Sequence, residues 1–236
     1  MIDFLLAFAA LAVATPQAPP AAKHSRPPAA KSAKKPAPRA SATVKLDLTQ
    51  SAAATRVIDW VAASGDNGAL PYIVIDKNNA AAFLFDATGQ AVAKAPVLVG
   101  VAVGDEATPG IGSKNLAEIG PAEKTTPAGR FLAKYGIAAG RQKVLWVDYA
   151  TSVALHPIPV GYNPKERRRE RMASPAPGDH RITFGCINVP STFYSKSVQP
   201  LFRKKGGYVY ILPDTKPIET VFPLLLGQAV ASGGSR

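Results

Sequence analysis

The fold of this chain is decided by the stretch YIVIDKNNAAAFLFD at residues 72–86. It holds two apolar segments, 72–76 and 81–86, separated by Lys77-Asn78-Asn79. Short segments rich in β-branched and aromatic residues on either side of a turn signal predict two β-strands. The sheet of the globular part is therefore expected to begin here.

Further short apolar segments follow, with Gly, Pro and Asn residues between them. They lie at residues 97–103, 129–135, 144–149, 152–156 and 207–212. Repeated short strands with this punctuation predict a mainly β domain, either a sandwich or a barrel. The chain shows neither a βαβ repeat nor an internal repeat.

Two segments have helical character. Residues 51–64 carry Ser51 as a candidate N-cap and are followed by Gly65, as expected for a short helix. Residues 190–205 begin with Pro190, which is favourable at the first helical position. Pro200 is expected to kink or end this second helix.

The N-terminal 45 residues differ from the rest of the 236-residue, +12 chain. Residues 1–14 form an apolar run that ends in a small-x-small pattern, which predicts an export signal. The residues before the apolar core include Asp3 and no Lys or Arg, which is unusual for a signal peptide. The alternatives are therefore a signal anchor or a misplaced start codon. Residues 15–45 are rich in Pro, Ala and Lys and lack acidic residues, which predicts a disordered basic tether. Its charge suits an anionic envelope polymer, or it serves only as a solvated spacer.

The remaining boundaries follow from the same patterns. We expect a helical lead-in at 46–70, a catalytic domain at 71–213 and a peripheral tail at 214–236. An exported chain of this kind is expected to reside in the periplasm or the cell wall, so nucleic acid is not an expected partner.

Cys186 is the only cysteine in the chain. A single cysteine excludes an internal disulfide and a multi-thiolate metal site. It is therefore a small buried residue, an intermolecular bridge or a reactive thiol. An unpaired thiol in an oxidising compartment suggests a use, and Gly185 beside it would allow close approach of a ligand. We favour a nucleophile, which needs a base or a cationic partner.

The chain has three histidines that could serve as this base. His156 ends the apolar run 153–156, 30 positions before Cys186, so two strands would have to bring the pair together. His180 is nearer but follows a Pro/Gly/Asp loop, and we keep it as the alternative. His24 lies in the tether and has no expected role. Between His156 and Cys186, a Pro- and Arg-rich segment predicts an inserted loop whose basic cluster is either a solvated face or an electropositive rim.

The segment TFGCIN at 183–188 resembles the catalytic motif of the L,D-transpeptidase family, of the YkuD type. The family motif is Ser/Thr-His-Gly-Cys-hydrophobic-Asn/Arg with an upstream histidine, and five of six positions match. The segment TTPAGRF at 125–131 also resembles the family's Thr-Pro-x-Gly-x-Phe segment. The resemblance spans roughly residues 70–213 and implies a YkuD-like β-sandwich or barrel with a short helix after the cysteine.

The resemblance also implies chemistry and roles. Cys186 would attack a peptidoglycan stem peptide, release D-alanine and pass the acyl group from a thioester to an amine or to water. His156 would be the base, oriented by the Pro157 backbone, and the amides of Gly185 and Cys186 would bind the oxyanion. The remaining motif residues and their neighbour would contact or orient substrate; they are Thr183, Phe184, Asn188 and Arg181. The resemblance implies no metal or organic cofactor and leaves the oligomeric state open, with a monomer favoured.

Two features depart from the family pattern. Phe184 stands where the motif has a histidine, and the spacer between His156 and Cys186 is about twice the usual length. Two alternatives to a transpeptidase therefore stay open: a related cysteine hydrolase of the L,D-carboxypeptidase type, and a wall-binding module that has lost activity.

Overall fold

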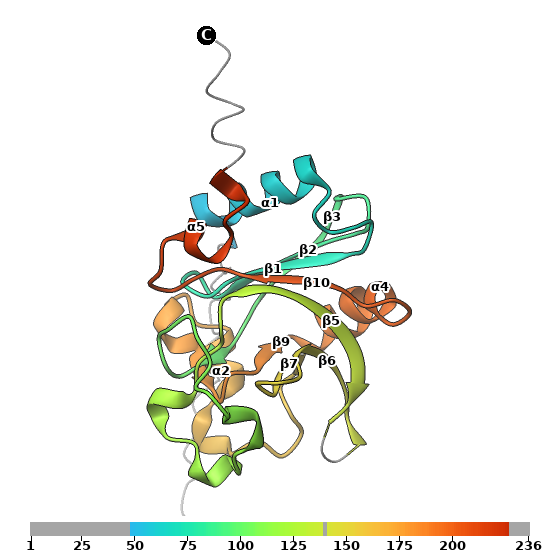
Figure 1. The fold of residues 1–236 in the computed structure, drawn as a ribbon. Helices are drawn as coiled ribbons and strands as arrows, with labels where there is room; N and C mark the ends of the chain where they lie inside the picture. Colours follow the sequence, from blue (N-terminus) through green and yellow to red (C-terminus); the bar gives the residue numbers. More distant parts are fainter. Residues whose placement is uncertain (1–47, 139–140, 227–236) are drawn as a thin grey trace, which may run out of the picture. The chain divides into compact units, whose positions relative to one another are not determined.

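The computed structural model describes residues 48–138 and 141–226. The predicted export signal and tether lie outside the described residues. Eight strands form one sheet in the order β3-β2-β1-β10-β5-β6-β7-β9, and β4 pairs with β8 in a second, two-stranded sheet (Figure 1). The strands are β1 (Tyr72–Asp76), β2 (Ala81–Phe85), β3 (Ala91–Pro96), β4 (Val99–Gly100), β5 (Gly129–Ile137), β6 (Lys143–Asp148), β7 (Val153–Pro157), β8 (Arg181–Thr183), β9 (Ile187–Val189) and β10 (Gly207–Ile211). The prediction of a mainly β fold is confirmed.

The predicted hairpin is present, with Val74 of β1 opposite Phe83 of β2 in an antiparallel ladder. Strands β3, β8 and β9 were not predicted. Strand β3 is alanine-rich and largely exposed, and β8 and β9 are only three residues long, so none carries a strong apolar signal. The expected strand at 97–103 is instead the two-residue β4, with an isolated bridge from Ala102 to Thr125 beyond it.

The sheet curls until its two ends nearly meet. Leu98, two residues after the edge strand β3, exchanges two backbone hydrogen bonds of 2.9 Å with Asn188 of the opposite edge strand, β9. Strands β7 and β9 are parallel and directly paired, although 29 residues separate their ends at Pro157 and Ile187. This pairing brings the two halves of the candidate site together.

Helix α1 (Ala52–Ser64) covers one face of the sheet, as the sequence predicted (Figure 1). Ser51 caps it by accepting a 3.0 Å hydrogen bond from the Ala54 amide. Gly65 ends it at φ 68°, a left-handed conformation that favours glycine. The apolar side of α1 packs on the aromatic residues of β1, β2 and β10, while the opposite face of these strands contributes to a larger core inside the curled sheet.

The expected peripheral tail is, over residues 214–225, an integral part of this fold. The amides of Asp214, Thr215 and Lys216 donate to the buried Asp105 carboxylate. Helix α5 (Ile218–Val221) follows, and the buried Phe222 packs against Trp60 of α1. The prediction missed this because Asp214 is held by a distant acid rather than by its neighbours.

The predicted helix after Cys186 is present as a continuous helical segment. It comprises α3 (Ser191–Phe193), a π-helical stretch labelled η7 (Tyr194–Val198) and α4 (Gln199–Phe202). Pro200 lies inside α4 rather than ending the helix. The wider π turn immediately before it accommodates the missing N–H of the proline.

Within the described part of the chain, no helix is both long enough and apolar enough to cross a bilayer.

Candidate active site

The pairing of β7 with β9 brings the strand of His156 beside the segment that contains Cys186. His156 lies opposite Asn188 in the parallel ladder, and Cys186 immediately precedes β9. Paired residues in a ladder point to the same face, so His156 and Asn188 share a face of the sheet.

The ring of His156 is held in one orientation by its own strand. Its Nδ1 lies 2.7 Å from the Pro157 carbonyl oxygen, which can only accept, so Nδ1 is the protonated nitrogen. Nε2 then carries the lone pair that a general base requires. Burial lowers the pKa of His156, the Pro157 carbonyl opposes this, and the positive charge of Arg168 lowers the pKa further. The imidazole is therefore neutral at neutral pH.

Cys186 is a half-buried thiol that donates to the Ser152 carbonyl oxygen across 3.6 Å. Ser152 has a φ of 58° in the turn between β6 and β7, a strained conformation for a non-glycine residue. Burial raises the pKa of Cys186, whereas the Ala154 amide and the charge of Arg168 lower it. Burial thus favours the neutral form of the thiol.

The backbone before the thiol is fixed by the segment 125–127. Gly185 has a φ of 126°, and a Cβ atom there would lie 2.7 Å from the Thr125 carbonyl oxygen, so only glycine fits. The Thr126 hydroxyl donates to the Gly185 carbonyl at 2.8 Å and accepts from the Gly100 amide at 2.9 Å. The Thr-Pro segment that drew attention in the sequence thus holds the nucleophile loop.

The structure gives Thr183 a different role from the expected contact with substrate. Thr183 is buried, and its hydroxyl donates to the Cys186 carbonyl at 2.6 Å. The same hydroxyl accepts from the Gly185 amide at 3.2 Å. Thr183 therefore closes the turn that presents the thiol. The Gly185 amide, expected to bind an oxyanion, is engaged inside this turn.

Phe184 lies at the rim of the site, half-buried, with the Lys124 ammonium 3.7 Å from the centre of its ring. This is a cation–π contact. A cation held over an aromatic ring near the thiol is a feature that the sequence did not predict, because Lys124 is 60 positions away along the chain.

Asn188 is fully buried in β9, where it pairs with His156 of β7. Its Oδ1 accepts from Arg168 Nη1 at 2.7 Å, and its Nδ2 has no partner among the described residues. Arg168 belongs to α2 (Arg168–Met172), in the segment that we call the insert, residues 158–180. The predicted inserted loop therefore reaches the site through one arginine.

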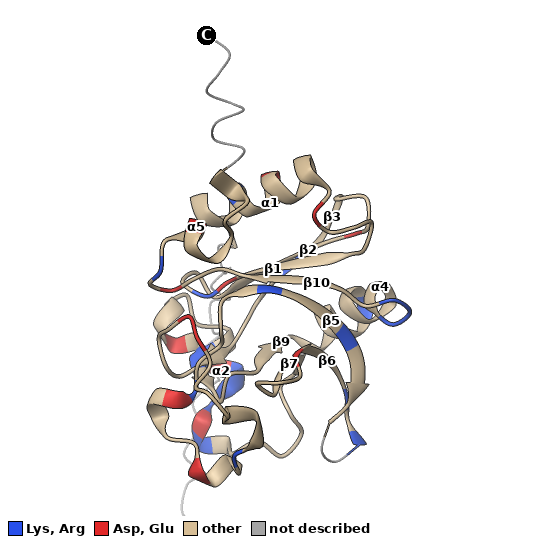
Figure 2. Cartoon of the chain, viewed as in Figure 1, with Lys and Arg blue, Asp and Glu red and all other residues tan. Residues whose placement is uncertain are grey.

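Sequence reasoning did not single out Arg168. It is one of four arginines at 167–171, and Figure 2 shows basic residues gathered on α2. Arg168 is 9% exposed, whereas Arg167 and Arg169 are exposed. A five-residue helix has too little periodicity to reveal which of its arginines turns inward.

Arg181, expected to contact substrate, is instead part of a buried ion cluster. Its Nη2 pairs with Asp214 at 2.7 Å. Asp214 and Asp105 both pair with Lys77, at 3.3 and 3.1 Å. Burial acts to raise the pKa of Asp105, but the amides that donate to its carboxylate lower the pKa well below its usual range. Lys77 also donates to the Thr126 carbonyl at 2.9 Å, so the cluster supports the segment that holds Gly185.

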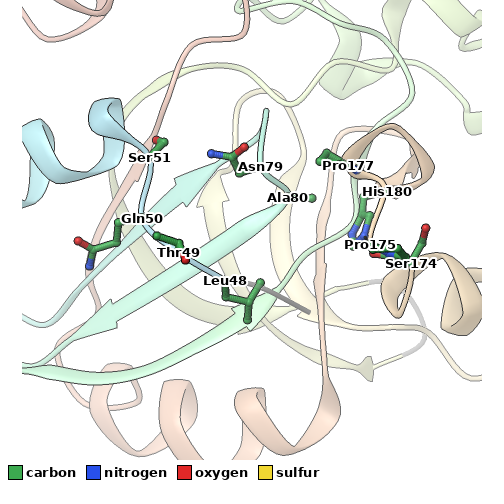
Figure 3. Close-up of a pocket in the computed structure, with 10 residues that line it drawn as sticks. All are labelled: Leu48, Thr49, Gln50, Ser51, Asn79, Ala80, Ser174, Pro175, Pro177 and His180. Carbon is green, nitrogen blue, oxygen red and sulfur yellow. Dashed lines mark hydrogen bonds between the residues drawn. The ribbon is translucent and has the colours of Figure 1, made fainter. Parts of the chain in front are cut away.

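His180, the alternative base, is occupied elsewhere. It is 2% exposed, its Nδ1 lies 2.8 Å from the Val97 carbonyl oxygen and its Nε2 lies 2.9 Å from that of Ser174. It lines a cavity of about 410 Å³ between the N-terminal segment 48–51, the β1–β2 turn and the insert (Figure 3). With both ring nitrogens committed to carbonyl groups, His180 fastens the insert to the sheet.

Among the described residues, no group of three or more His, Cys, Asp or Glu side chains could hold a metal ion.

No protein-family model matches the chain, and no curated protein matches it by sequence. The solved structures that are similar to the chain include the following two. One is the helical cell shape determining protein Pgp2 (K307A mutant) of Campylobacter jejuni, with a TM-score of 0.42 and 11% identity over 78% of this chain and 64% of that chain. The other is the catalytic domain of the E. faecium L,D-transpeptidase, with a TM-score of 0.30 and 18% identity over 60% of this chain and 95% of that chain.

The chain thus spans less than two thirds of the Pgp2 chain that it matches. At this level of similarity neither structure assigns an activity to the chain.

Proposed function

We propose that the chain is an exported cysteine acyltransferase of the cell wall, a peptidoglycan L,D-transpeptidase. The observation that carries the proposal is the parallel pairing of β7 with β9, which brings the strand of His156 beside the segment that follows Cys186. The motif residues 183–188 and the orientation of His156 by the Pro157 carbonyl support it.

The chemistry follows from the state of the pair. His156 Nε2 takes the thiol proton as Cys186 Sγ attacks the carbonyl carbon before a terminal D-alanine. The C–N bond breaks, the leaving amine takes the proton from the imidazolium, and D-alanine departs. An amine of a second stem peptide then attacks the thioester, a new amide forms and the thiol is regenerated. Water in place of the amine would give hydrolysis.

Stabilisation of the oxyanion is assigned to the backbone at Cys186. The Thr183 hydroxyl, the Thr126 hydroxyl and the conformation of Gly185 hold this turn in a fixed shape before substrate arrives. Donors that are fixed in advance stabilise developing charge without reorganisation at the moment of reaction. Substrate contacts are assigned to the rim formed by Phe184 and Lys124.

Product analysis tests the proposal. The purified chain is incubated with disaccharide-tetrapeptides, and the products are identified by liquid chromatography and mass spectrometry, with Cys186→Ala as the control. Cross-linked dimers that require Cys186 support transfer. Trimmed monomers alone would replace the proposal with a hydrolase, and unchanged substrate with measurable binding would replace it with a wall-binding module.

A further inference from the structure

The insert places one arginine on Asn188, which pairs with His156 in the β7–β9 ladder. Arg168 begins α2, and its side chain is buried while those of its neighbours Arg167 and Arg169 are exposed. A buried guanidinium remains charged, because arginine does not lose its proton in proteins. A buried charge of this kind is normally paired with an opposite charge and hydrogen-bonded.

Two hydrogen bonds fix the guanidinium of Arg168. Nε donates to Glu166 Oε2 at 2.6 Å, and Nη1 donates to Asn188 Oδ1 at 2.7 Å. Asn188 lies opposite His156 in the ladder and two residues after Cys186, on the same face. The guanidinium is therefore hydrogen-bonded to the residue that pairs with His156 and that follows Cys186 by two positions.

We propose that Arg168 is a positioning residue of this site, whose fixed positive charge stabilises the Cys186 thiolate and keeps the His156 imidazole neutral. The inference rests on the thiol–imidazole pair of the proposed function but not on its substrate. A cation beside a cysteine favours the thiolate, the form that reacts. The proposal also accounts for Phe184: a phenylalanine cannot supply a polar group to the thiol, whereas the insert can.

The surrounding charges fit this assignment. Glu166, partly exposed, balances the guanidinium from the side opposite Asn188, and Lys124 lies over Phe184 at the rim. His156 is neutral at neutral pH, and the Arg168 charge acts on both His156 and Cys186. Asn188, fully buried in β9, joins the arginine of the insert to the strand that follows Cys186.

The test uses the alkylation of Cys186 by iodoacetamide as a function of pH. Cys186 is the sole cysteine, so the rate reports on one thiol, and no cell-wall substrate is needed. Arg168→Gln should move the alkylation midpoint upward by about one pH unit or more, and slow alkylation about tenfold below the midpoint. Arg168→Lys should restore much of the rate. Arg169→Gln, an exposed neighbour on α2, should behave as wild type.

A second variant tests the direction in which a nearby charge moves the alkylation midpoint. Glu166→Gln removes the opposing charge and should move the midpoint downward. The proposal is overturned if Arg168→Gln folds with the wild-type melting temperature and an unchanged midpoint. If Arg168→Gln does not fold, an unchanged or raised midpoint in Glu166→Gln overturns it. Because alkylation needs no stem peptide, failure here is distinct from failure of the transpeptidase assay.

Discussion

The Thr126 hydroxyl donates a 2.8 Å hydrogen bond to the carbonyl oxygen of Gly185, the residue before Cys186. The two residues are 59 positions apart in the sequence. Thr126 is itself held by Lys77, which donates to the Thr126 carbonyl. A chain of buried polar contacts thus runs from the ion cluster of Lys77, Asp105 and Asp214 to the backbone of the thiol.

Thr126→Val should weaken this connection without a change of shape. It leaves the Gly185 carbonyl and the Gly100 amide without their buried partner, which should lower the free energy of unfolding by about 2 kcal/mol and slow alkylation of Cys186. Urea denaturation and iodoacetamide kinetics measure both effects. Thr125→Val is the matched control, because no hydrogen bond of the Thr125 hydroxyl is present within residues 48–138 and 141–226. Equal stability of the two variants would contradict the role of Thr126.

Gly185→Ala should be tolerated poorly. The substitution forces a side chain into a φ of 126° and brings its Cβ to 2.7 Å from the Thr125 carbonyl oxygen. Backbone strain of this kind costs about 1–3 kcal/mol. If the turn at 183–186 moved to relieve the strain, the thiol of Cys186 would be displaced. The melting temperature and the acylation rate should both fall. Gly178→Ala, where a Cβ meets open space, is the control, and a Gly185→Ala protein as active as this control would refute the assignment.

Substitutions of His156 and His180 should have different effects. His156→Ala should reduce acylation of Cys186 by a carbapenem roughly 10²- to 10⁴-fold, the usual range for a lost acid–base group. His180→Ala removes the contacts with Val97 and Ser174 and should lower the melting temperature instead. Intact-protein mass spectrometry follows acylation in both. The opposite outcome, with activity lost in His180→Ala alone, would make His180 the base.

The pH dependence of the acylation and alkylation rates should be that of a neutral imidazole at His156 and a neutral thiol at Cys186. Burial lowers the pKa of His156, so the acid limb of the acylation rate should lie below pH ~6.5, the ordinary value for imidazole. As the pH falls through that lowered pKa, the base becomes protonated and the rate declines. Burial raises the pKa of Cys186, so the midpoint of direct alkylation should lie above the ordinary thiol value of about 8.5. A midpoint near neutrality would instead indicate a preformed thiolate–imidazolium pair.

Local patterns predicted much of this fold. The hairpin at 72–86, the cap of Ser51 on α1 and the helix after Cys186 all depend on residues that are close in sequence. The strands β8 and β9 could not be predicted, because three residues carry no usable period. They are stabilised by pairing with distant strands, and the sequence does not display that pairing.

The candidate site likewise has some features that the sequence predicted and others that it did not. The pairing of β7 with β9 agrees with the expectation that two strands meet here, although β9 begins only after Cys186, and the Pro157 carbonyl does contact the imidazole. Thr183 and Arg181 were assigned to substrate because they flank the cysteine, but each is committed to a structural partner. Arg168 and Lys124 reach the site only through tertiary contacts of long side chains.

The most direct test of the central claim is the intact mass of the protein during reaction with a disaccharide-tetrapeptide. The account predicts a transient adduct with the mass of the donor minus D-alanine, mapped to the peptide that contains Cys186 and absent in Cys186→Ala. Addition of an amine acceptor should remove the adduct. An adduct that persists in Cys186→Ala, or product that forms without any acyl-enzyme on Cys186, would contradict the account.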